Sequence, residues 1–315
     1  MRILFVSSGN AKDGISPIVQ NQGQSLINYG IFVDFFTIKG KGLWSYFRHI
    51  FILRIYLKTN KFDIIHSHYS FSSFVATLAG ARPLVVSLMG SDVLSDRFAR
   101  LFIYLLHKHF WAQTIVKSRD MYKCLGFIKT GIIPNGVDLA RFNYLDKKPC
   151  QVKLGWDSEK GHILFAADPN RPEKNFSLVR IAIELLKSNN KLVIHILKNI
   201  PNEDIPNYMN ATDILILSSL HEGSPNVIKE AMACNCPIVT TNVGDVNWVL
   251  GNTDGCYLTS FEPEDVAEKI KLAIEFRETY GHTRGRERII ELGLDSETIA
   301  GKIISVYNKV LEITD

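Results

Sequence analysis

Short apolar segments alternate with longer segments of helical periodicity through the first half of the chain. The apolar segments are predicted to be buried strands at 3–6, 32–36, 64–66, 84–88 and 114–116. The segments between them are predicted to be helices at 18–28, 70–79 and 97–110. Strands that alternate with helices are typical of βαβ units, so we expect a parallel sheet covered by helices.

The same alternation starts again after a polar, irregular segment at 145–160, which contains Pro149 and Gly155 and is interpreted as a linker. Further strands are predicted at 162–167, 192–197, 213–218, 237–241 and 256–258. Further helices are predicted at 176–187, 225–233, 246–250, 264–276 and 296–313. With 315 residues, the chain is therefore predicted to form two doubly wound α/β domains, at 1–148 and 149–295, with a ligand cleft between them.

Charge is distributed unevenly between the two halves. Residues 1–150 contain 19 Lys and Arg residues against eight Asp and no Glu, whereas the remainder contains 17 against 24. Such a basic half could meet anionic lipid, nucleic acid or an anionic substrate. No apolar run reaches the roughly 20 residues that a membrane span needs. The chain starts with a strand-like segment, so no signal peptide is expected, and its five cysteines show no paired framework, so free thiols in the cytoplasm are expected.

The segment at 39–61 mixes aromatic, aliphatic and basic residues and contains no acidic residue. One interpretation is a helix that lies on an anionic membrane surface. The other is a helix packed on its own sheet with a basic outer face. Because the apolar residues are not confined to one stripe, the sequence leaves both interpretations open.

The segment from Glu222 to Glu230 reads as the loop and helix start that follow a buried strand. Gly223 lets the backbone approach a ligand, and Pro225 suits the first turn of a helix. The N-terminus of a helix offers free N–H groups and a positive dipole end, which favour an anion. Two acidic side chains beside an anion site suggest a ligand with both hydroxyls and phosphates, such as a sugar nucleotide.

Other polar residues also follow predicted strands, where open α/β sheets bind ligands. Arg171 and Lys174 are three residues apart and are candidates to bind a diphosphate. His68 and Asp92 follow two strands of the first half and are candidates for a substrate contact or an acid–base role, and for His68 a hydrogen-bonded structural role is the alternative. A glycine loop that ends at Gly14 gives a weak phosphate signal of its own.

The residues around Glu222 and Glu230 resemble the EX7E motif of the retaining family 4 glycosyltransferases, which have the GT-B fold of two Rossmann-like domains. The neighbouring sequence is also similar to that family, and the similarity extends from the loop at 9–14 to the tail. The matching segments are Ala-Thr-Asp-Ile-Leu-Ile-Leu-Ser at 211–218, Glu-Gly-Ser-Pro-Asn-Val at 222–227, Glu-Ala-Met-Ala at 230–233, Pro-Ile-Val-Thr-Thr-Asn-Val-Gly at 237–244 and Ile-Pro-Asn-Gly-Val-Asp at 133–138.

The resemblance implies that the second domain binds a nucleotide sugar, usually of the UDP or GDP type, and that the first domain binds the acceptor. Arg171 and Lys174 would stabilise the leaving diphosphate in place of a metal, so no cofactor is expected. Glu222 would contact the transferred sugar and Glu230 the ribose. The other implied donor contacts are Gly14, Leu197, Gly223, Ser224, Pro225, Asn226 and Val227. The helix at 296–315 would cross back to the first domain.

Two departures from the family pattern affect the catalytic assignments. The family commonly has Gly-Arg after the first strand of the donor domain, where this chain has Ala-Ala-Asp at 166–168, so the arginine role passes to Arg171. Many members have His-Gly-x-Asp where this chain has Met89-Gly-Ser-Asp92. Asp92 or His68 would then take over part of the work of the missing histidine.

The sequence therefore predicts a metal-independent retaining glycosyltransferase that acts on a glycan or lipid-linked saccharide, in surface polysaccharide biosynthesis. The expected location is cytoplasmic, with peripheral binding to the inner face of the plasma membrane through 39–61. A GT-B-type UDP-sugar 2-epimerase and a non-catalytic sugar-nucleotide-binding subunit are the alternatives. No nucleic-acid partner is expected, since no recognised binding module is present.

Overall fold

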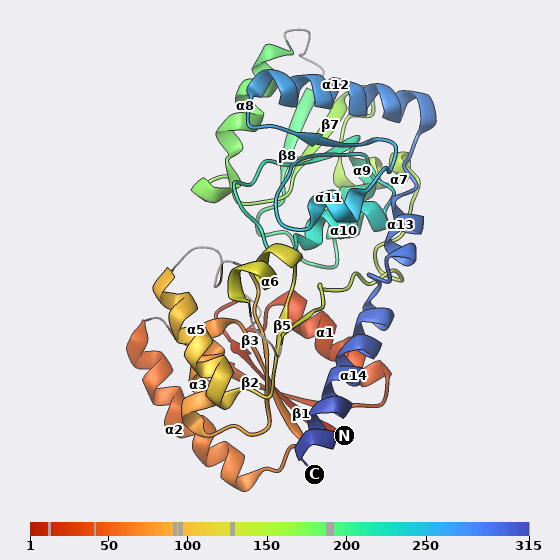
Figure 1. Ribbon diagram of the computed structural model, residues 1–315. Coiled ribbons are helices and arrows are strands. Elements are labelled where there is room, and N and C mark those ends of the chain that lie inside the picture. The colour runs from red at the N-terminus through yellow and green to blue at the C-terminus, as the bar shows by residue number, and fades with distance from the viewer. Residues whose placement is uncertain are drawn as a thin grey trace. The chain divides into compact units, whose positions relative to one another are not determined.

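Figure 1 shows a computed structural model of the chain, which describes residues 1–11, 14–40, 42–90, 93, 97–126, 130–186 and 192–314. The chain forms two compact units. Unit 1 comprises Met1–Gly136 and Ser296–Asp315, and unit 2 comprises Val137–Asp295. The division falls after Gly136, not after 148, because Arg286 binds the following loop. Its guanidinium donates to the carbonyl oxygens of Leu139 and Phe142, each at 2.8 Å.

Unit 1 is built on a six-stranded parallel sheet in the order β2-β1-β3-β4-β5-β6. The strands are β1 (Arg2–Ser8), β2 (Phe32–Ile38), β3 (Ile64–His68), β4 (Leu84–Ser87), β5 (Gln113–Val116) and β6 (Thr130–Ile132). The near-continuous apolar runs of β1 and β4 are buried because helices cover both faces of the sheet. The predicted strands are confirmed, whereas the three-residue β6 was not predicted, because so short a segment carries no periodicity.

Helices cover the two faces of this sheet unequally (Figure 1). The structure describes these helices in unit 1: α1 (Pro17–Asn28), α2 (Leu43–Thr59), α3 (Ser70–Ala79), α5 (Arg97–Phe110), α6 (Arg119–Leu125) and α14 (Ser296–Thr314). Side chains of α2, α3, α5 and α6 form one hydrophobic core with the sheet. The tail helix α14 packs against α1 and, through Tyr307, against β3 on the other face.

Unit 2 is built on a five-stranded parallel sheet in the order β11-β10-β9-β7-β8. The strands are β7 (Gly161–Phe165), β8 (Leu192–Ile196), β9 (Ile214–Leu217), β10 (Ile238–Thr241) and β11 (Cys256–Thr259). All five were predicted from their apolar runs. The predicted α/β class with two Rossmann-like units is therefore confirmed.

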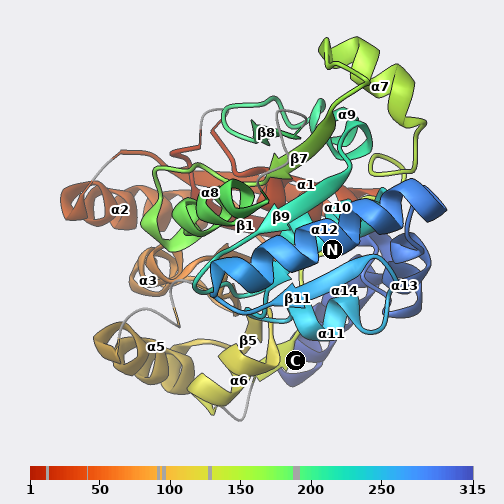
Figure 2. The same ribbon diagram turned by 90° about the horizontal axis from the view of Figure 1, so that it is seen from above.

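Two helices of unit 2 lie side by side on one face of this sheet, as Figure 2 shows for α8 (Phe176–Leu185) and α12 (Pro263–Tyr280). Their apolar residues complete the core of the unit. Other helices of unit 2 are α7 (Lys147–Leu154), α9 (Ile205–Ala211), α10 (Asn226–Ala233), α11 (Val246–Leu250) and α13 (Gly285–Glu291), with a 3-10 turn, η1 (Pro172–Lys174).

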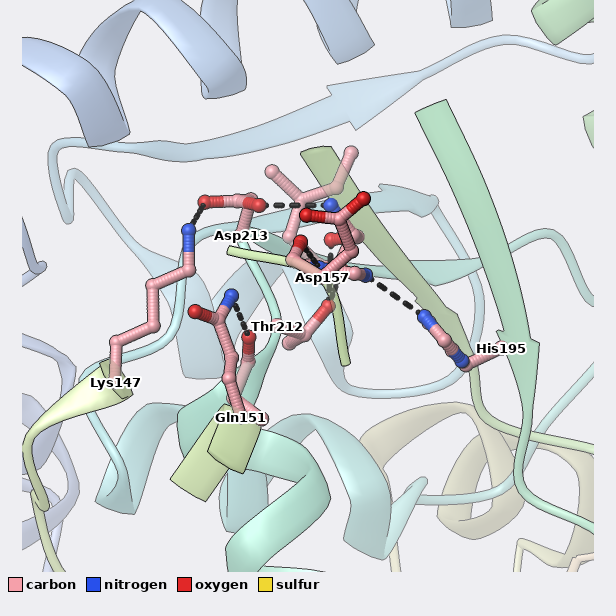
Figure 3. Close-up of polar contacts among 9 residues, drawn as sticks. Lys147, Gln151, Asp157, His195, Thr212 and Asp213 are labelled. Carbon is pink, nitrogen blue, oxygen red and sulfur yellow. Dashed lines mark hydrogen bonds and ion pairs between the residues drawn. The ribbon is translucent and has the colours of Figure 1, made fainter. Parts of the chain in front are cut away.

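The prediction of an irregular linker at 145–160 is wrong, because this segment contains the helix α7. Pro149 lies in the first turn, where the backbone N–H groups have no intrahelical partner, and Gly155 ends the helix in a left-handed conformation. Figure 3 shows how α7 is fixed: Lys147 forms an ion pair with Asp213, which also accepts a hydrogen bond from the His162 N–H at 2.7 Å. These contacts come from residues more than 50 positions away, so the local pattern does not contain them.

Among the residues that the structure describes, no helix is both long enough and apolar enough to cross a membrane.

Candidate active site

The strand order of unit 2 places a topological switch point between β7 and β9. The chain leaves β7 towards β8 at one side, and then returns to form β9 on the other side of β7. The loops that follow these two strands diverge at the carboxyl edge of the sheet, where open α/β sheets bind ligands. One loop carries Lys174 and the other carries Glu222, so the two candidate residues flank the switch point.

The two loops are held together by hydrogen bonds. Ser218 Oγ donates to the carbonyl oxygens of Lys174 and Asn175, at 2.8 and 3.0 Å. The Leu220 N–H donates to the carbonyl oxygen of Glu173 at 2.9 Å. The turn that carries Lys174 is therefore fixed to the end of β9.

Lys174 and Glu222 meet across the switch point. The Lys174 ammonium forms an ion pair with Glu222 Oε1, and Ser219 Oγ donates to the same oxygen at 2.8 Å. Both charged side chains are largely buried, with exposures of 14% and 18%. A cation held by a carboxylate at this position can exchange that partner for a phosphate oxygen, because both are charged oxygen acceptors.

Arg171 lies on the same loop but has a different partner. Its guanidinium donates to Glu173 Oε1 from Nε at 2.8 Å and from Nη2 at 2.5 Å, and its side chain is exposed. Another cation, Lys198 after β8, forms a 3.1 Å ion pair with Asp168. The backbone N–H of Asn170 and then Lys198 lower the pKa of Asp168 below its usual value. The sequence did not single out Lys198, although it follows a predicted strand on this edge.

Helix α10 starts at Asn226, one residue later than the sequence predicted. Pro225 is the N-cap residue, and the first N–H groups of the helix have no intrahelical acceptor. Glu230 lies one turn into this helix. Its side chain keeps some exposed surface, but the protein surrounds the carboxyl group, and this desolvation raises its pKa to about 7. The positive charges of Arg141 and Lys229 oppose that shift.

Gly244, in the loop after β10, packs against the backbone of the Glu222 loop. A Cβ atom at this position would lie 2.5 Å from the carbonyl oxygen of Gly223 and 2.8 Å from that of Glu222. The φ angle of Gly244 is also positive, at +60°. Only glycine fits this close approach without moving the loop.

In unit 1 the candidate His68 is buried and stacks on His66 at 4.4 Å between ring centroids. His66 is hydrogen-bonded to the Tyr307 hydroxyl at 2.6 Å and to Ser87 Oγ at 2.8 Å. Neither ring nitrogen of His68 has a hydrogen-bond partner within the described parts of the chain. Desolvation, together with Lys117, lowers the pKa of His68 to about 3, so this ring is neutral at physiological pH.

The remaining candidates are spread over both units. Gly14 closes a tight turn with φ +88°, and its N–H donates to the carbonyl oxygen of Ala11 at 2.9 Å. Leu197 continues β8, with its N–H on the carbonyl oxygen of Phe165 at 3.0 Å. Asp92 lies outside the residues that the structure describes. Within unit 2, Lys174, Glu222 and the start of α10 thus come together around one sheet edge.

Two family models match the chain, one in each half. Residues 10–141 match the model described as Glycosyltransferase Family 4, and residues 162–275 match the model described as Glycosyl transferases group 1. The second match includes Lys174, Glu222 and Glu230. Together the two matches cover most of the chain.

Curated relatives belong to the same class of protein. The chain is 26% identical to the putative teichuronic acid biosynthesis glycosyltransferase TuaC of Bacillus subtilis, over 66% of this chain and 60% of that protein. It is 25% identical to the UDP-Gal:alpha-D-GlcNAc-diphosphoundecaprenol alpha-1,3-galactosyltransferase of Escherichia coli, over 62% of each chain. The chain thus spans about three fifths of the length of these relatives.

Solved structures show the same fold. The sucrose-phosphate synthase of Thermosynechococcus elongatus superposes with a TM-score of 0.78 and 15% identity, over 99% of this chain and 100% of that one. Two Rossmann-like units in one chain with this similarity identify the GT-B fold. The two family matches agree with the motif around Glu222 and show that the chain belongs to the family 4 glycosyltransferases of group 1.

Proposed function

We propose that the protein transfers a sugar from a nucleotide sugar to a glycan or lipid-linked saccharide, with retention of anomeric configuration and without a metal ion. The observation that carries this proposal is the ion pair between Lys174 and Glu222 at the switch point of unit 2. It places one cation and one carboxylate beside the N-terminus of α10, which is the combination that a sugar diphosphate needs.

The two residues exchange partners when the donor binds. Glu222 holds Lys174 in place at the switch point, so the cation has a fixed orientation in which to receive a phosphate. The diphosphate then takes the place of the carboxylate on Lys174, and Glu222 is released to accept hydrogen bonds from sugar hydroxyls. Lys174 stabilises the negative charge that develops as the diphosphate leaves, and a charge placed in advance is effective because little reorganisation is required.

The relatives support UDP as the nucleotide and a lipid-linked diphosphate saccharide as the acceptor. The relative from Escherichia coli is named for a UDP-galactose donor and a diphosphoundecaprenol acceptor, and the relative from Bacillus subtilis for teichuronic acid biosynthesis. These names support a role in surface polysaccharide biosynthesis, and we propose that the protein acts on the cytoplasmic side of the membrane. Glu230 would bind the ribose hydroxyls in its ionised form.

The first experiment is a thermal-shift screen of UDP-, GDP- and ADP-sugars, since a ligand that binds only the native state raises its melting temperature. Transfer by Glu222→Gln and by Lys174→Met is then measured with the donor so identified. We expect each variant to lower kcat by about 10²–10³, the loss found when one preorganised charge-stabilising group is removed.

Lys271→Met is the matched control, because Lys271 forms an exposed ion pair with Glu275 on α12. Full activity in the Lys174→Met variant would contradict the proposal. An isomerised sugar that forms from a UDP-sugar without acceptor would instead identify an epimerase. Activity that is lost in EDTA and regained with Mg²⁺ or Mn²⁺ would contradict metal independence.

We also propose that α2 binds an anionic membrane surface. One face of this helix packs into the core of unit 1. The opposite face is exposed and consists of Trp44, Phe47, Arg48, Phe51, Ile55 and Lys58, which recur at helical spacing. Trp44 is 87% exposed, and the helix contains no acidic residue. The two interpretations of 39–61 are thus compatible, because separate faces serve the core and the surface.

Flotation with lipid vesicles tests this part of the proposal. The protein should float with vesicles that contain phosphatidylglycerol and less with phosphatidylcholine alone. The triple variant Trp44→Ser, Phe47→Ser, Phe51→Ser should lose this binding. A control variant, Val152→Ser with Tyr280→Ser, removes exposed apolar groups from unit 2 and should float as the wild type does. Absence of wild-type binding to either vesicle would rule out α2 as a membrane contact.

A further inference from the structure

A buried polar network lies directly behind the Glu222 loop in unit 2. Lys229 Nζ donates to Ser224 Oγ at 2.8 Å, and Ser224 Oγ donates to Asp245 Oδ2 at 2.6 Å. Lys229 is 1% exposed, and Ser224 and Asp245 are each 8% exposed. The Ser224 hydroxyl therefore links a cation from α10 with an anion from the loop after β10.

Burial of the charged groups in this network has an unfavourable free energy. Burial lowers the pKa of Lys229 and raises that of Asp245, and each charge opposes the shift of the other. Asp245 Oδ1 is also buried and has no hydrogen-bond partner among the described residues. Replacing a buried ion pair by apolar residues of similar size is often neutral or stabilising, so folding stability alone does not account for the network.

The network is hydrogen-bonded to the loop that carries the candidate active-site groups. Ser224 is two residues from Glu222 and one residue before Pro225, the N-cap of α10. Gly244, next to Asp245, packs against the carbonyl oxygens of Glu222 and Gly223. The side-chain bonds of Ser224 and the backbone contact of Gly244 thus fix how Glu222 approaches Lys174.

We propose that Lys229 and Asp245 are positioning residues of the active site, which act through Ser224 to hold the Glu222 carboxylate and the first N–H groups of α10 in their ligand-binding arrangement. The Ser224 side chain is then occupied within the protein and is not a donor contact. The nature of the ligand rests on the proposed function, whereas the positioning role rests on the contacts in unit 2.

The test uses Lys229→Met, Asp245→Leu and the double variant. Each single variant leaves one buried charge without its opposite and should lower the melting temperature. The double variant removes both charges and should recover most of that stability. If the pair only stabilised the fold, loop exchange and nucleotide affinity in the double variant would also return to wild-type values. If the pair positions the loop, both would stay impaired.

Two readouts separate these cases. Amide hydrogen exchange of the 219–228 peptide should be at least tenfold faster in the double variant than in the wild type, at comparable melting temperature. The affinity for UDP or GDP, measured by calorimetry, should fall at least tenfold. The control is the double variant Lys147→Met, Asp213→Leu, which removes the ion pair shown in Figure 3. Asp213 precedes β9, whereas the Glu222 loop follows this strand. It should leave the exchange of the 219–228 peptide unchanged.

Wild-type exchange rates in the recovered Lys229→Met, Asp245→Leu variant would overturn the positioning proposal. A double variant that recovers none of the lost stability would show that the fold itself depends on Lys229 and Asp245, and would overturn the proposal as well. A wild-type protein that binds neither UDP nor GDP would contradict the proposed function instead, and the exchange measurement would still decide the role of Lys229 and Asp245.

Discussion

The two units carry polar side chains at the switch points of their sheets, but in opposite electrostatic states. In unit 2 the switch between β7 and β9 is occupied by a charged pair, Lys174 and Glu222, whose side chains retain some exposure. In unit 1 the switch lies between β1 and β3, and the imidazoles of β3 are buried. His66 and His68 stack on one another and have lowered pKa values, so they are neutral at physiological pH.

This difference separates the groups that can stabilise charge from those that organise the fold. A charged pair at a sheet edge can bind a phosphate and support a departing anion. The neutral stack instead links the strands to the tail helix, through the hydrogen bond between His66 and Tyr307. His68 remains a candidate for an acid–base role, but it would first have to become accessible to substrate.

Among substitutions outside the charged pair itself, Gly244→Ala should have the largest effect, because it disturbs the charged site of unit 2 and leaves unit 1 unchanged. The new methyl group would collide with the carbonyl oxygens of Glu222 and Gly223 and force their loop to move. A displacement of about 1 Å in such a site can lower kcat by about 10². Gly281→Ala is the matched control, since Gly281 also has a positive φ, +80°, but no atom lies within 4 Å of the added Cβ. Equal kcat for the two variants would show that the close approach of Gly244 does not matter.

The pH dependence of stability should reveal the opposite states of the two units. In the unfolded chain His68 binds a proton below about pH 6.5, whereas in the native protein its pKa is about 3. The unfolded state therefore binds more protons between pH 6.5 and 4.5, and the free energy of unfolding falls as the pH falls. The slope from one such histidine is at most about 1.4 kcal/mol per pH unit.

Glu230 acts in the reverse direction, because its native pKa of about 7 lies above the ordinary value of 4.5. Between these values the native state binds more protons, so this residue lowers stability as the pH rises. In denaturant titrations at pH 4.5, 5.5 and 6.5, His68→Leu should flatten the dependence and Glu230→Gln should steepen it. His109→Leu, at an exposed histidine, is the control variant. A slope unaffected by either of the first two variants would refute the assignment.

A smaller effect is expected when the neutral network of unit 1 loses one partner. Tyr307→Phe removes the hydroxyl that bonds to His66 and leaves a buried ring nitrogen unsatisfied. The loss should be about 1–3 kcal/mol in the free energy of unfolding, with little change in the affinity for UDP or GDP. Tyr280→Phe, at a tyrosine that is 69% exposed, should change neither quantity. A large loss of nucleotide affinity in Tyr307→Phe would mean that the histidine network supports binding directly.

The sequence predicted the fold well wherever periodicity was strong and local. Helices α3 and α5 were predicted with the observed bounds, and every predicted strand is present. Short elements were missed for two reasons. The three residues of β6 are too few to show alternation, and α7 was taken for a linker because Pro149 and Gly155 usually interrupt helices, although both are tolerated near helix ends.

The sequence named candidate residues of the site but not their pairings. It named Arg171, Lys174, Glu222 and Glu230, yet only the fold shows that Lys174 binds Glu222 while Arg171 binds Glu173. Asp245 could not be found from the sequence, because its link to Ser224 joins residues 21 positions apart in different loops. Pairings of this kind depend on strand order and register, which no local pattern encodes.

The smallest effect on stability is expected at Arg171, whose ion pair with Glu173 is exposed. Removing an exposed pair usually costs less than about 1 kcal/mol, so Arg171→Ala should melt close to the wild type. If Arg171 leaves Glu173 to bind the diphosphate, the same variant should weaken UDP binding by about tenfold, the loss expected for one charge-assisted contact. Arg180→Ala removes a comparable exposed pair, with Glu184 on α8, and should affect neither quantity. If Arg171→Ala leaves the UDP affinity unchanged while Lys198→Ala lowers it, the phosphate role would belong to Lys198, the cation that pairs with Asp168. The charged site of unit 2 would then depend on Lys174 and Lys198.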